Sequence, residues 1–306
     1  MTPAAHIAAA IEILDLILSG ENAEASLTKW GRSNRFAGSG DRNAIRDIVF
    51  DALRQKNSLT KRLKKISGRS WIIALLKKRE VNFDEYFGAS RYSPPEIKKW
   101  ELDLLPIKNE SDFHDIPGWL WPKWKATLGR NANHVANTLK ERANIFLRVN
   151  ISKVTRKVAI QALERDGITS KLHPSVSTAL IVNKGTRNIK NSEAYNLGLV
   201  ELQDASSQAS VLSLSKDQNG PILDFCAGGG GKSLALNAYL NKPIFAYDVN
   251  FERMKDLNKR ASRSGADIRI IKSNELKNSH YGLVFCDAPC SGSGTWRRDP
   301  EGKWSL

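Results

Sequence analysis

The first 140 residues carry apolar side chains at three- and four-residue spacing, which is the period of an amphipathic helix. The first such stripe consists of Ile7, Ile11, Leu14 and Leu18. Gly20 follows this stripe as a stop signal, and a second helix is expected over residues 21–30. Asp41 is expected to cap a third helix, because its side chain can accept a hydrogen bond from a first-turn amide. The pattern predicts a helical domain over residues 1–140.

The hydrophobic pattern changes near residue 144. Residues 145–150 and 179–183 are apolar runs typical of strands, and residues 155–165 between them have helical spacing. A strand, a helix and a second strand of this length predict a small α+β module over residues 141–203. Asp204 then stands where it can cap a helix that runs to about residue 214.

From residue 221 onward, short apolar segments alternate with helical ones. Strands are expected at residues 222–227, 244–249, 268–272 and 281–287, with helices at 232–240 and 251–264. Apolar strands that alternate with helices predict a parallel sheet covered on both faces. Such sheets bind their ligands at the carboxyl ends of the strands. The third domain, residues 204–306, is therefore expected to be Rossmann-like and to hold a ligand at that edge.

Composition and charge narrow the class of protein. The 306 residues are 41% hydrophobic, which excludes a disordered or coiled-coil chain, and three cysteines suit a reducing compartment better than a disulfide scaffold. Because no apolar stretch is long enough to span a bilayer, no membrane association is expected, and a soluble, cytoplasmic protein is predicted. The formal net charge of +15 favours an anionic partner, most simply a nucleic acid.

The densest positive charge lies between Arg54 and Arg79, where ten basic residues occur without an acidic one. Such a cluster contacts phosphates without reading the base sequence, although a solvated helix face is the alternative interpretation. The expected RNA-binding residues in this stretch are Lys61, Arg62, Lys64 and Lys65. Further along, Trp119, Trp121 and Trp124 fit either base stacking or, more commonly in a helical domain, packing.

The first strand of the third domain leads into a glycine run, DFCAGGGGKS at residues 224–233. Glycines let backbone amides approach a ligand closely, and Asp248 at the end of the second strand suits a ribose diol. Together they predict an adenosine-containing cofactor without naming it. A P-loop nucleotidase is disfavoured because Cys226 stands where that motif needs a glycine, and a nicotinamide dehydrogenase is a weaker alternative.

The fourth strand leads into DAPCSGSGTWRRDPE, which begins at Asp287. This segment places a carboxylate three residues before the thiol of Cys290. Thiolate addition to carbon 6 of a pyrimidine makes carbon 5 nucleophilic enough to accept a methyl group, and a nearby acid can stabilise the ring nitrogen. Strand alternation predicts that Cys286 is buried in the core. Cys286 and Cys290 are too few for a metal site, so no metal is expected.

At these residues the chain resembles the RsmB/NOP/Sun family of S-adenosylmethionine-dependent RNA cytosine-5 methyltransferases. DFCAGGGGKS is similar to the first family motif, YDVNFERMKDL to the second and DAPCSGSGTWRRDPE to the fourth. The helical domain resembles the NusB-like domain of bacterial members, and FLRVN with LVELQDASSQ resembles their RNA-binding module. The resemblance implies methyl transfer from S-adenosylmethionine to carbon 5 of a cytosine in RNA, most simply ribosomal RNA.

The resemblance also implies individual roles. Cys290 resembles the cysteine that helps to release the product, and Asp287 would face both cofactor and cytosine. Lys232 is the third catalytic candidate. Asp248 would bind the ribose hydroxyls, while Asn274 replaces the aspartate that the family usually has near the adenine. The implied cofactor-binding residues are Cys226, Ala227, Gly228, Gly229, Gly230, Gly231, Lys232, Asp248, Arg253, Asn274 and Asp287.

One departure from the family pattern concerns the nucleophile. In the family it is a second cysteine, in a Thr-Cys-Ser motif some tens of residues after the fourth motif, and this sequence contains no such motif. Three further strands of the family fold have no counterpart, so a methyltransferase sheet truncated after its fourth strand is expected. The interpretations are an incomplete version of a longer enzyme, or a short form that binds RNA and cofactor without catalysis. In a short form, Cys290 is the alternative nucleophile. The sequence leaves the oligomeric state open.

Overall fold

The computed structural model describes residues 1–103, 114–276 and 280–306. These residues form two units, one made of Met1–Ala143 with Cys290–Leu306 and the other of Asn144–Pro289. The α+β module and the parallel sheet therefore share a unit, and the residues from Cys290 onward pack with the helices. The division into three domains at residues 140 and 203 remains a prediction.

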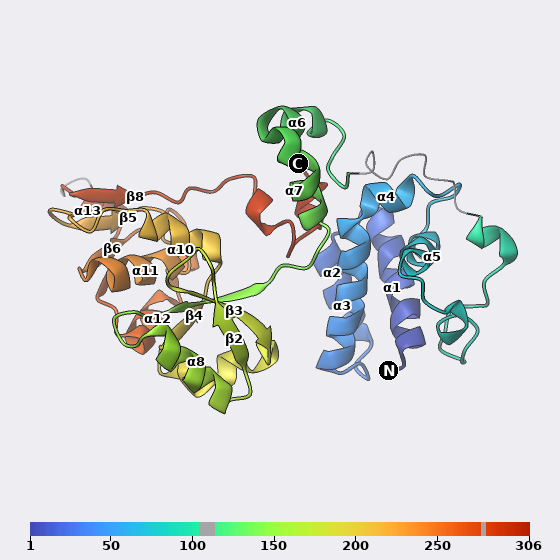
Figure 1. The fold of residues 1–306 in the computed structure, drawn as a ribbon, viewed down its shortest axis with the longest axis horizontal. Coiled ribbons are helices and arrows are strands. Elements are labelled where there is room, and N and C mark those ends of the chain that lie inside the picture. The colour runs from blue at the N-terminus through green and yellow to red at the C-terminus, as the bar shows by residue number, and fades with distance from the viewer. Residues whose placement is uncertain (104–113, 277–279) are drawn as a thin grey trace. The chain divides into compact units, whose positions relative to one another are not determined.

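The first unit is helical (Figure 1). Its α-helices are α1 (Pro3–Leu18), α2 (Ala23–Ser33), α3 (Ser39–Arg54), α4 (Lys56–Thr60), α5 (Gly68–Lys78), α6 (Trp121–Leu128) and α7 (Ala132–Thr138). Short 3-10 turns add η1 (Phe83–Glu85), η2 (Lys99–Leu102), η4 (Gly129–Asn131), η7 (Ser293–Thr295) and η8 (Glu301–Lys303). The described residues of Met1–Ala143 thus form helices, and both a separate domain over residues 1–140 and its likeness to NusB remain predictions.

Helix starts follow from local hydrogen bonding. Thr2 caps α1 by accepting a hydrogen bond from the amide of Ala5, at 3.2 Å. The prediction that Asp41 caps the third helix is wrong, because α3 begins at Ser39 with Gly38 as its N-cap. Asp41 lies inside the first turn, and its carboxylate reaches back to accept from the amide of Gly38, at 2.9 Å. The acid therefore stabilises the helix start from the third position.

The core of the helical unit is one apolar cluster formed mainly by α1, α3 and α5. The predicted first stripe contributes to it, since Ile7 and Leu14 are buried and Ile11 and Leu18 pack against the cluster, and Ile13 and Ile45 are fully buried as well. Trp71 and Leu75 of α5 are also buried. Burying large side chains of this kind contributes about 1.5–3 kcal/mol each, so this unit has a substantial core before any other segment packs on it.

The second unit begins with an antiparallel sheet of order β2-β3-β1-β4. Its strands are β1 (Ile145–Val149), β2 (Thr169–Leu172), β3 (Ala179–Lys184) and β4 (Val200–Leu202), accompanied by α8 (Arg156–Arg165), η5 (Thr186–Asn191) and α9 (Glu193–Asn196). The predicted strands at 145–150 and 179–183 correspond to β1 and β3. Strand β2 was not predicted, because its sequence TSKL is largely exposed and has no apolar alternation.

The same unit contains a parallel sheet of order β7-β6-β5-β8, as the alternating pattern predicts. Its strands are β5 (Ile222–Asp224), β6 (Ile244–Ala246), β7 (Ile268–Ile270) and β8 (Leu283–Phe285). The helices around it are α10 (Ala205–Leu212), α11 (Gly231–Leu240), η6 (Phe251–Met254), α12 (Leu257–Ser264) and α13 (Ser273–Leu276). Asp204 caps α10 as predicted, by accepting from the amide of Ser206 at 3.0 Å.

Buried polar contacts connect the two sheets of this unit. Asn150, just after β1, donates through its side-chain amide to the carbonyls of Gly198 (3.1 Å) and Ser264 (2.9 Å). Glu201 of β4 is 3% exposed and forms ion pairs with Arg260 and Arg263 of α12. These contacts hold α12, and with it the loop that follows β6, against the antiparallel sheet.

Along residues 1–103, 114–276 and 280–306, no helix has both the length and the apolar character needed to cross a membrane.

Candidate functional site

The glycine run follows β5 and leads into α11. Gly228 and Gly230 have φ angles of +49° and +79°, in the left-handed region that favours glycine. A side chain at Gly230 would place its Cβ 1.9 Å from a methyl group of Leu257, which is fully buried. The amide of Ala227 donates to the carbonyl of Tyr247, at 2.9 Å. The run is therefore a tight loop held against the end of β6, and its sequence must be glycine-rich.

Asp248 holds this loop. It lies just beyond β6, is 4% exposed, and accepts hydrogen bonds from the amides of Gly228 and Asn250, each at 2.9 Å. Arg253 pairs with the same carboxylate at 3.2 Å. A carboxylate has about four acceptor positions, so Asp248 retains capacity for about one further hydrogen bond, such as one from a hydroxyl group. The structure thus brings the glycine run, Asp248 and Arg253 together, as the motifs predict.

Lys232 and Asp287 form an ion pair at the same edge of the sheet. Lys232 lies in the first turn of α11, Asp287 lies two residues beyond β8, and the ammonium is 2.6 Å from a carboxylate oxygen. Strands β5 and β8 are neighbours, which explains how residues 55 positions apart meet. The Asp287 side chain is half exposed, so a ligand can reach it.

Asp224 was not assigned a role from the sequence, although it ends β5 beneath the glycine run. It is fully buried, and one carboxylate oxygen accepts from the hydroxyl of Ser233, at 2.7 Å. The other oxygen has no hydrogen-bond partner among the described residues. Burial raises the pKa of Asp224 to about 6, against the hydrogen bond from Ser233 and the charge of Lys232. An acidic residue that ends a buried strand is the signal in the sequence.

Gln203 and Arg260 flank the glycine run and were also missed. Arg260 donates to the carbonyl of Gly229 while pairing with Glu201, at 3.0 Å. The side-chain oxygen of Gln203 is buried without a partner among the described residues. The Gln203 amide nitrogen would lie 3.7 Å from a Cβ built on Gly231. A buried acceptor without a partner beside a glycine loop fits a group that hydrogen-bonds to a ligand.

Cys226 and Cys286 lie side by side at this edge, with their sulfurs 3.9 Å apart. The prediction that Cys286 is buried in the core is wrong, since Cys286 is exposed. The physical reason is that β8 ends at Phe285, so the strand alternation stops one residue before the cysteine. Among the described residues, no cluster of three or more His, Cys, Asp or Glu side chains could hold a metal ion.

Two predicted site residues are not brought into this group. Asn274 is exposed in α13, after β7. Cys290 is exposed and begins the segment that packs with the helical unit. The second unit therefore gathers Cys226, Lys232, Asp248 and Asp287 at one sheet edge, and Cys290 belongs to the other unit.

The segment that starts at Cys290 is anchored within the helical unit by tryptophans. Trp296 is 2% exposed and stacks with Trp124 of α6, with ring centroids 6.1 Å apart. The indole nitrogen of Trp304 donates to the carbonyl of Leu53, at 2.8 Å. Of the three tryptophans considered for base stacking, Trp124 thus packs internally and Trp121 stacks on a histidine ring, whereas Trp119 is 56% exposed.

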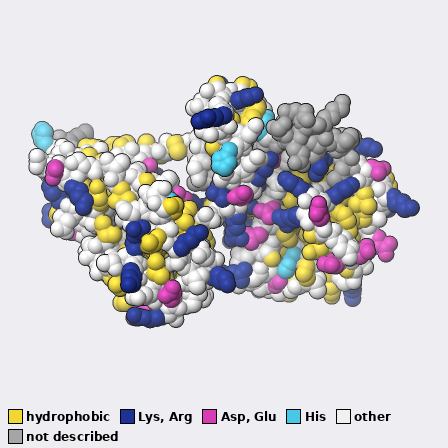
Figure 2. Space-filling model, viewed as in Figure 1, with side chains coloured by type: hydrophobic (Ala, Val, Ile, Leu, Met, Phe, Trp, Pro, Cys, Tyr) yellow, Lys and Arg dark blue, Asp and Glu magenta, His cyan; other side chains and the backbone are white. Residues whose placement is uncertain are grey.

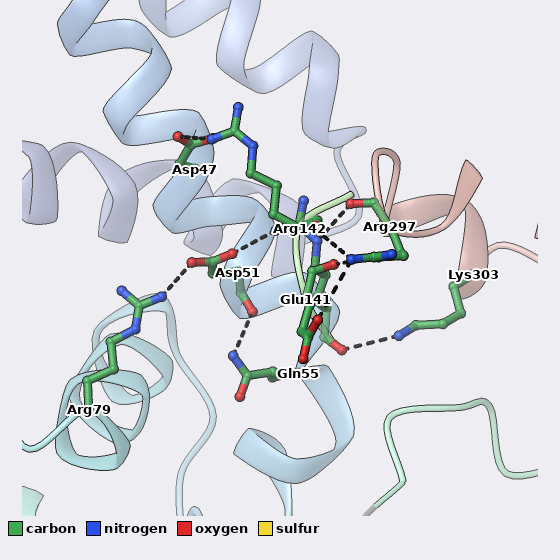
Figure 3. A network of polar contacts seen from close by, with 9 residues as sticks. Asp47, Asp51, Gln55, Arg79, Glu141, Arg142, Arg297 and Lys303 are labelled. Atoms are coloured by element: carbon green, nitrogen blue, oxygen red, sulfur yellow. Dashed lines mark hydrogen bonds and ion pairs between the residues drawn. The ribbon is translucent and has the colours of Figure 1, made fainter. Parts of the chain in front are cut away.

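Polar contacts complete this anchoring (Figure 3). The guanidinium of Arg297 donates to the carbonyls of Glu141 and Arg142. The backbone carbonyl of Arg297 accepts a hydrogen bond from the side chain of Arg54, at 2.9 Å. Lys303 is fully buried and donates to the carbonyl of Arg54, at 3.2 Å. Burial lowers the pKa of Lys303 to about 8.

The basic stretch is less uniform than its sequence suggests. Arg54 is 4% exposed and pairs with Asp51, and Arg79 pairs with the same carboxylate (Figure 3). Arg69 pairs with Glu101, at 2.7 Å. Acidic residues elsewhere in the chain therefore supply counter-charges that the stretch itself lacks. On the face seen in Figure 2, Lys and Arg side chains are spread among acidic ones rather than gathered into one block.

The four predicted RNA-binding residues lie between α4 and α5. Lys61, Lys64 and Lys65 are exposed, while Arg62 is partly buried. Lys64 and Lys65 line a depression together with Trp100, which is 63% exposed, and with the acidic residues Glu101 and Asp103. Basic side chains beside an exposed aromatic ring are the combination that binds single-stranded nucleic acid.

These features define a class. A parallel sheet with a glycine loop after β5 and a buried carboxylate after β6 forms a Rossmann-like domain of the kind that binds nucleotide cofactors. The family follows from sequence comparison. Residues 116–188 match the ferredoxin-like domain of RsmF/B-like methyltransferases, and residues 209–306 match the 16S rRNA methyltransferase RsmB/F family. Together the matches cover more than half of the chain, and the chain belongs to the RsmB/F methyltransferase family.

Curated relatives agree with this assignment. The chain is 29% identical over 195 residues to ribosomal RNA small subunit methyltransferase B of Cronobacter sakazakii, covering 61% of the chain and 45% of the relative. It is 25% identical over 217 residues to the protein of the same name from Shewanella oneidensis, covering 68% and 50%. The chain thus spans about half the length of the curated relatives it matches.

Solved structures share the fold. The crystal structure of PH0851 aligns with a TM-score of 0.68 at 21% identity, covering the whole of this chain and 79% of that one. A methyltransferase homolog protein from Pyrococcus horikoshii aligns with a TM-score of 0.51 at 24% identity, covering 57% of this chain and 59% of the other.

Proposed function

We propose that this protein binds S-adenosylmethionine at the carboxyl edge of the parallel sheet and transfers its methyl group to carbon 5 of a cytosine in ribosomal RNA. The observation that carries the proposal is the convergence of the glycine run, Asp248 and the Lys232–Asp287 pair at one sheet edge. Membership of the RsmB/F family supports the methyl-transfer chemistry and the ribosomal RNA substrate.

The residues at this edge fit the cofactor. The tight loop offers backbone groups without side-chain obstruction, Asp248 can accept from a ribose hydroxyl, and Gln203 presents a buried oxygen without a described partner. The proposed contacts come from Cys226 to Lys232, Asp248, Arg253, Asn274 and Asp287. When bound, S-adenosylmethionine supplies an electrophilic methyl group.

The residues of this chain have distinct proposed tasks in the transfer. Asp287, half exposed and held by Lys232, accepts a hydrogen bond from the cytosine ring nitrogen once that nitrogen is protonated, and so orients the base. Lys232 keeps Asp287 in place through the ion pair. Cys290, whose thiol is exposed, assists product release. The base would have to lie near Asp287, so that carbon 5 approaches the cofactor at the same edge. Carbon 5 accepts the methyl group only after a thiolate adds to carbon 6, and loss of the carbon 5 proton then releases that thiolate. Among the cysteines of this sequence, Cys290 is the alternative for this addition.

Methyl transfer is tested with labelled S-adenosylmethionine and unmodified small-subunit ribosomal RNA. The RNA is digested to nucleosides, and 5-methylcytidine is measured by mass spectrometry. We expect label in 5-methylcytidine, and less of it with Asp287→Asn. Binding of cofactor and RNA without any transfer would contradict the catalytic part and favour a binding protein. Label on another base would contradict the cytosine assignment.

RNA contact by the loop between α4 and α5 is tested by changing Lys61, Arg62, Lys64 and Lys65 together to Glu. Each phosphate contact contributes about −0.7 to the slope of log affinity against log salt for single strands. We therefore expect weaker binding and a flatter salt dependence, measured by fluorescence anisotropy with an RNA fragment. A matched control changes four other exposed basic residues of the helical unit, Lys29, Arg32, Arg35 and Arg91, to Glu. Equal losses in both variants would mean that net charge, not this loop, determines binding.

A further inference from the structure

Two thiols meet at the proposed cofactor edge, and the mechanism uses neither sulfur. Cys226 follows β5 and Cys286 follows β8, which are neighbouring parallel strands. Their sulfurs are 3.9 Å apart although the residues are 60 positions apart in sequence. Cys286 is exposed and Cys226 is partly buried, so solvent reaches the pair.

We propose that Cys226 and Cys286 are a redox modification site, which a hydroperoxide converts to a disulfide that closes the cofactor-binding edge. The proposal of the disulfide rests on the geometry of the two thiols, and only its effect on the cofactor rests on the proposed function. A dithiol reductant restores both thiols by exchange.

The chemistry balances in two steps. The exposed Cys286 thiol reacts with the hydroperoxide to give a sulfenic acid, and the peroxide is reduced to an alcohol, or to water from hydrogen peroxide. The Cys226 thiol then attacks that sulfur, which forms the disulfide and releases water. Burial raises the pKa of the Cys226 thiol, with the neighbouring Cys286 as the next cause. Cys286 is therefore oxidised before Cys226, because the exposed sulfur meets the oxidant first.

The geometry allows the bond with small movements. A disulfide joins its sulfurs at about 2.05 Å, so the two must approach by about 2 Å. Both residues lie beyond the last residues of their strands, Asp224 and Phe285. Backbone hydrogen bonds from Phe225 to Phe285 and from Ala227 to Tyr247, each at 2.9 Å, still hold the residues on either side of Cys226, so the movement falls mainly to the Cys286 side. Rotation about the side-chain bonds and a shift of the flanking loops can supply this approach.

The bond would alter the cofactor edge on both sides. Cys226 directly precedes the glycine loop that Asp248 holds, and Cys286 directly precedes Asp287. Drawing the two loops together displaces the loop backbone and strains the Lys232–Asp287 pair. The loss of one such charged hydrogen bond corresponds to an affinity loss of about tenfold.

The test oxidises the protein with hydrogen peroxide, blocks free thiols and maps tryptic peptides by mass spectrometry. Trypsin cuts between Cys226 and Cys286, so their disulfide joins two peptides. A Cys290→Ser background makes the assignment unambiguous, because Cys290 shares a tryptic peptide with Cys286. In parallel, calorimetry measures the affinity for S-adenosylhomocysteine in the reduced, oxidised and re-reduced protein.

We expect the cross-linked peptide and an affinity about tenfold lower, restored by dithiothreitol. Cys226→Ser and Cys286→Ser should each abolish the cross-link and the sensitivity to peroxide. Absence of the cross-link, or a cross-link with unchanged affinity, would overturn the proposal. If even the reduced protein fails to bind S-adenosylhomocysteine, the proposed function fails, and the peptide map alone then decides whether the disulfide forms.

Discussion

The two units bury charged side chains for different purposes. In the helical unit, Asp115 is fully buried and accepts from the amide and hydroxyl of Ser58, each at 2.9 Å, with Lys140 at 3.3 Å. Lys303 is equally buried and donates to a carbonyl of α3. In the second unit, the buried carboxylates Asp224 and Asp248 stand at the ends of adjacent parallel strands.

The comparison distinguishes buried charges that hold segments of the fold together from buried charges at a ligand site. Asp115 and Lys303 of the helical unit connect segments far apart in sequence, through Ser58, Lys140 and a carbonyl of α3. Asp224 and Asp248 of the second unit lie beneath and beside a loop with open backbone, and Asp224 has an oxygen without a described partner. A buried charge therefore indicates a ligand site when it lies at a strand end and its bonding capacity is not filled.

The largest effect is expected from Trp296→Ala, because it removes a buried indole that stacks on Trp124. We expect the unfolding free energy of the helical unit to fall by about 3–5 kcal/mol, as measured by urea denaturation. Trp119→Ala in the same unit is the matched control, since Trp119 is 56% exposed. A loss for Trp296→Ala as small as that for Trp119→Ala would mean that the segment after Cys290 contributes little to the stability of this unit.

A second test uses the pH dependence of the unfolding free energy that Lys303 causes. Its folded pKa of about 8 lies below the unfolded value of about 10.5, so the unfolded chain binds more protons between these values. The unfolding free energy should therefore rise as the pH increases from about 8 to 10.5, by at most about 3 kcal/mol. Lys303→Met should lack this rise, whereas Lys255→Met, at an exposed lysine, should keep it. Parallel pH profiles for Lys303→Met and the wild type would contradict the burial of a charge.

In the second unit, the unfolding free energy should change with pH in the opposite direction, at acid pH. The folded pKa of Asp224, about 6, lies above its unfolded value of about 3.8, so the folded state binds more protons in this range. The unfolding free energy should fall by about 2–3 kcal/mol as the pH rises from about 4 to 6. Asp224→Asn should flatten this profile, with Asp256→Asn as the exposed control. An unchanged pH profile for Asp224→Asn would mean that another group causes this pH dependence.

The smallest effect concerns Asp248. Asp248→Asn keeps the size and one acceptor oxygen but removes the charge that Arg253 and two amides contact. We expect the affinity for S-adenosylhomocysteine to fall by about 1–3 kcal/mol in calorimetry, with Glu252→Gln as an exposed control. No loss would contradict the assignment of Asp248 to the ribose.

The sequence was most informative where one local rule decides the outcome. The parallel sheet followed from alternating apolar strands and helices, and the cap of α10 followed from Asp204. The meeting of the glycine run with Asp248 could be expected because both follow neighbouring strands. Each of these predictions depends on residues close in sequence or on the regular geometry of a parallel sheet.

Predictions that depend on partners distant in sequence were less successful. The basic stretch looked unpaired because Glu101, the partner of Arg69, lies outside it. Cys286 was placed in the core because the end of β8 could not be located to one residue. Gln203 escaped notice because its importance lies in burial and unfilled bonding capacity, which only the tertiary structure reveals. Asp224 has a signal in the sequence, its place at the end of a buried strand, but its unfilled bonding capacity is likewise visible only in the structure.

The packing of Trp296 and Lys303 with the first helices has a consequence for synthesis on the ribosome. Chains are made from the N-terminus, and domains generally fold as they emerge. The helices of Met1–Ala143 are made early, yet the side chains that cover Leu53 and Arg54 arrive only after the whole of Asn144–Pro289. During that interval, the surface around Trp124 stays open to solvent and to chaperones. The first unit to begin folding is thus completed only after the second unit has been made.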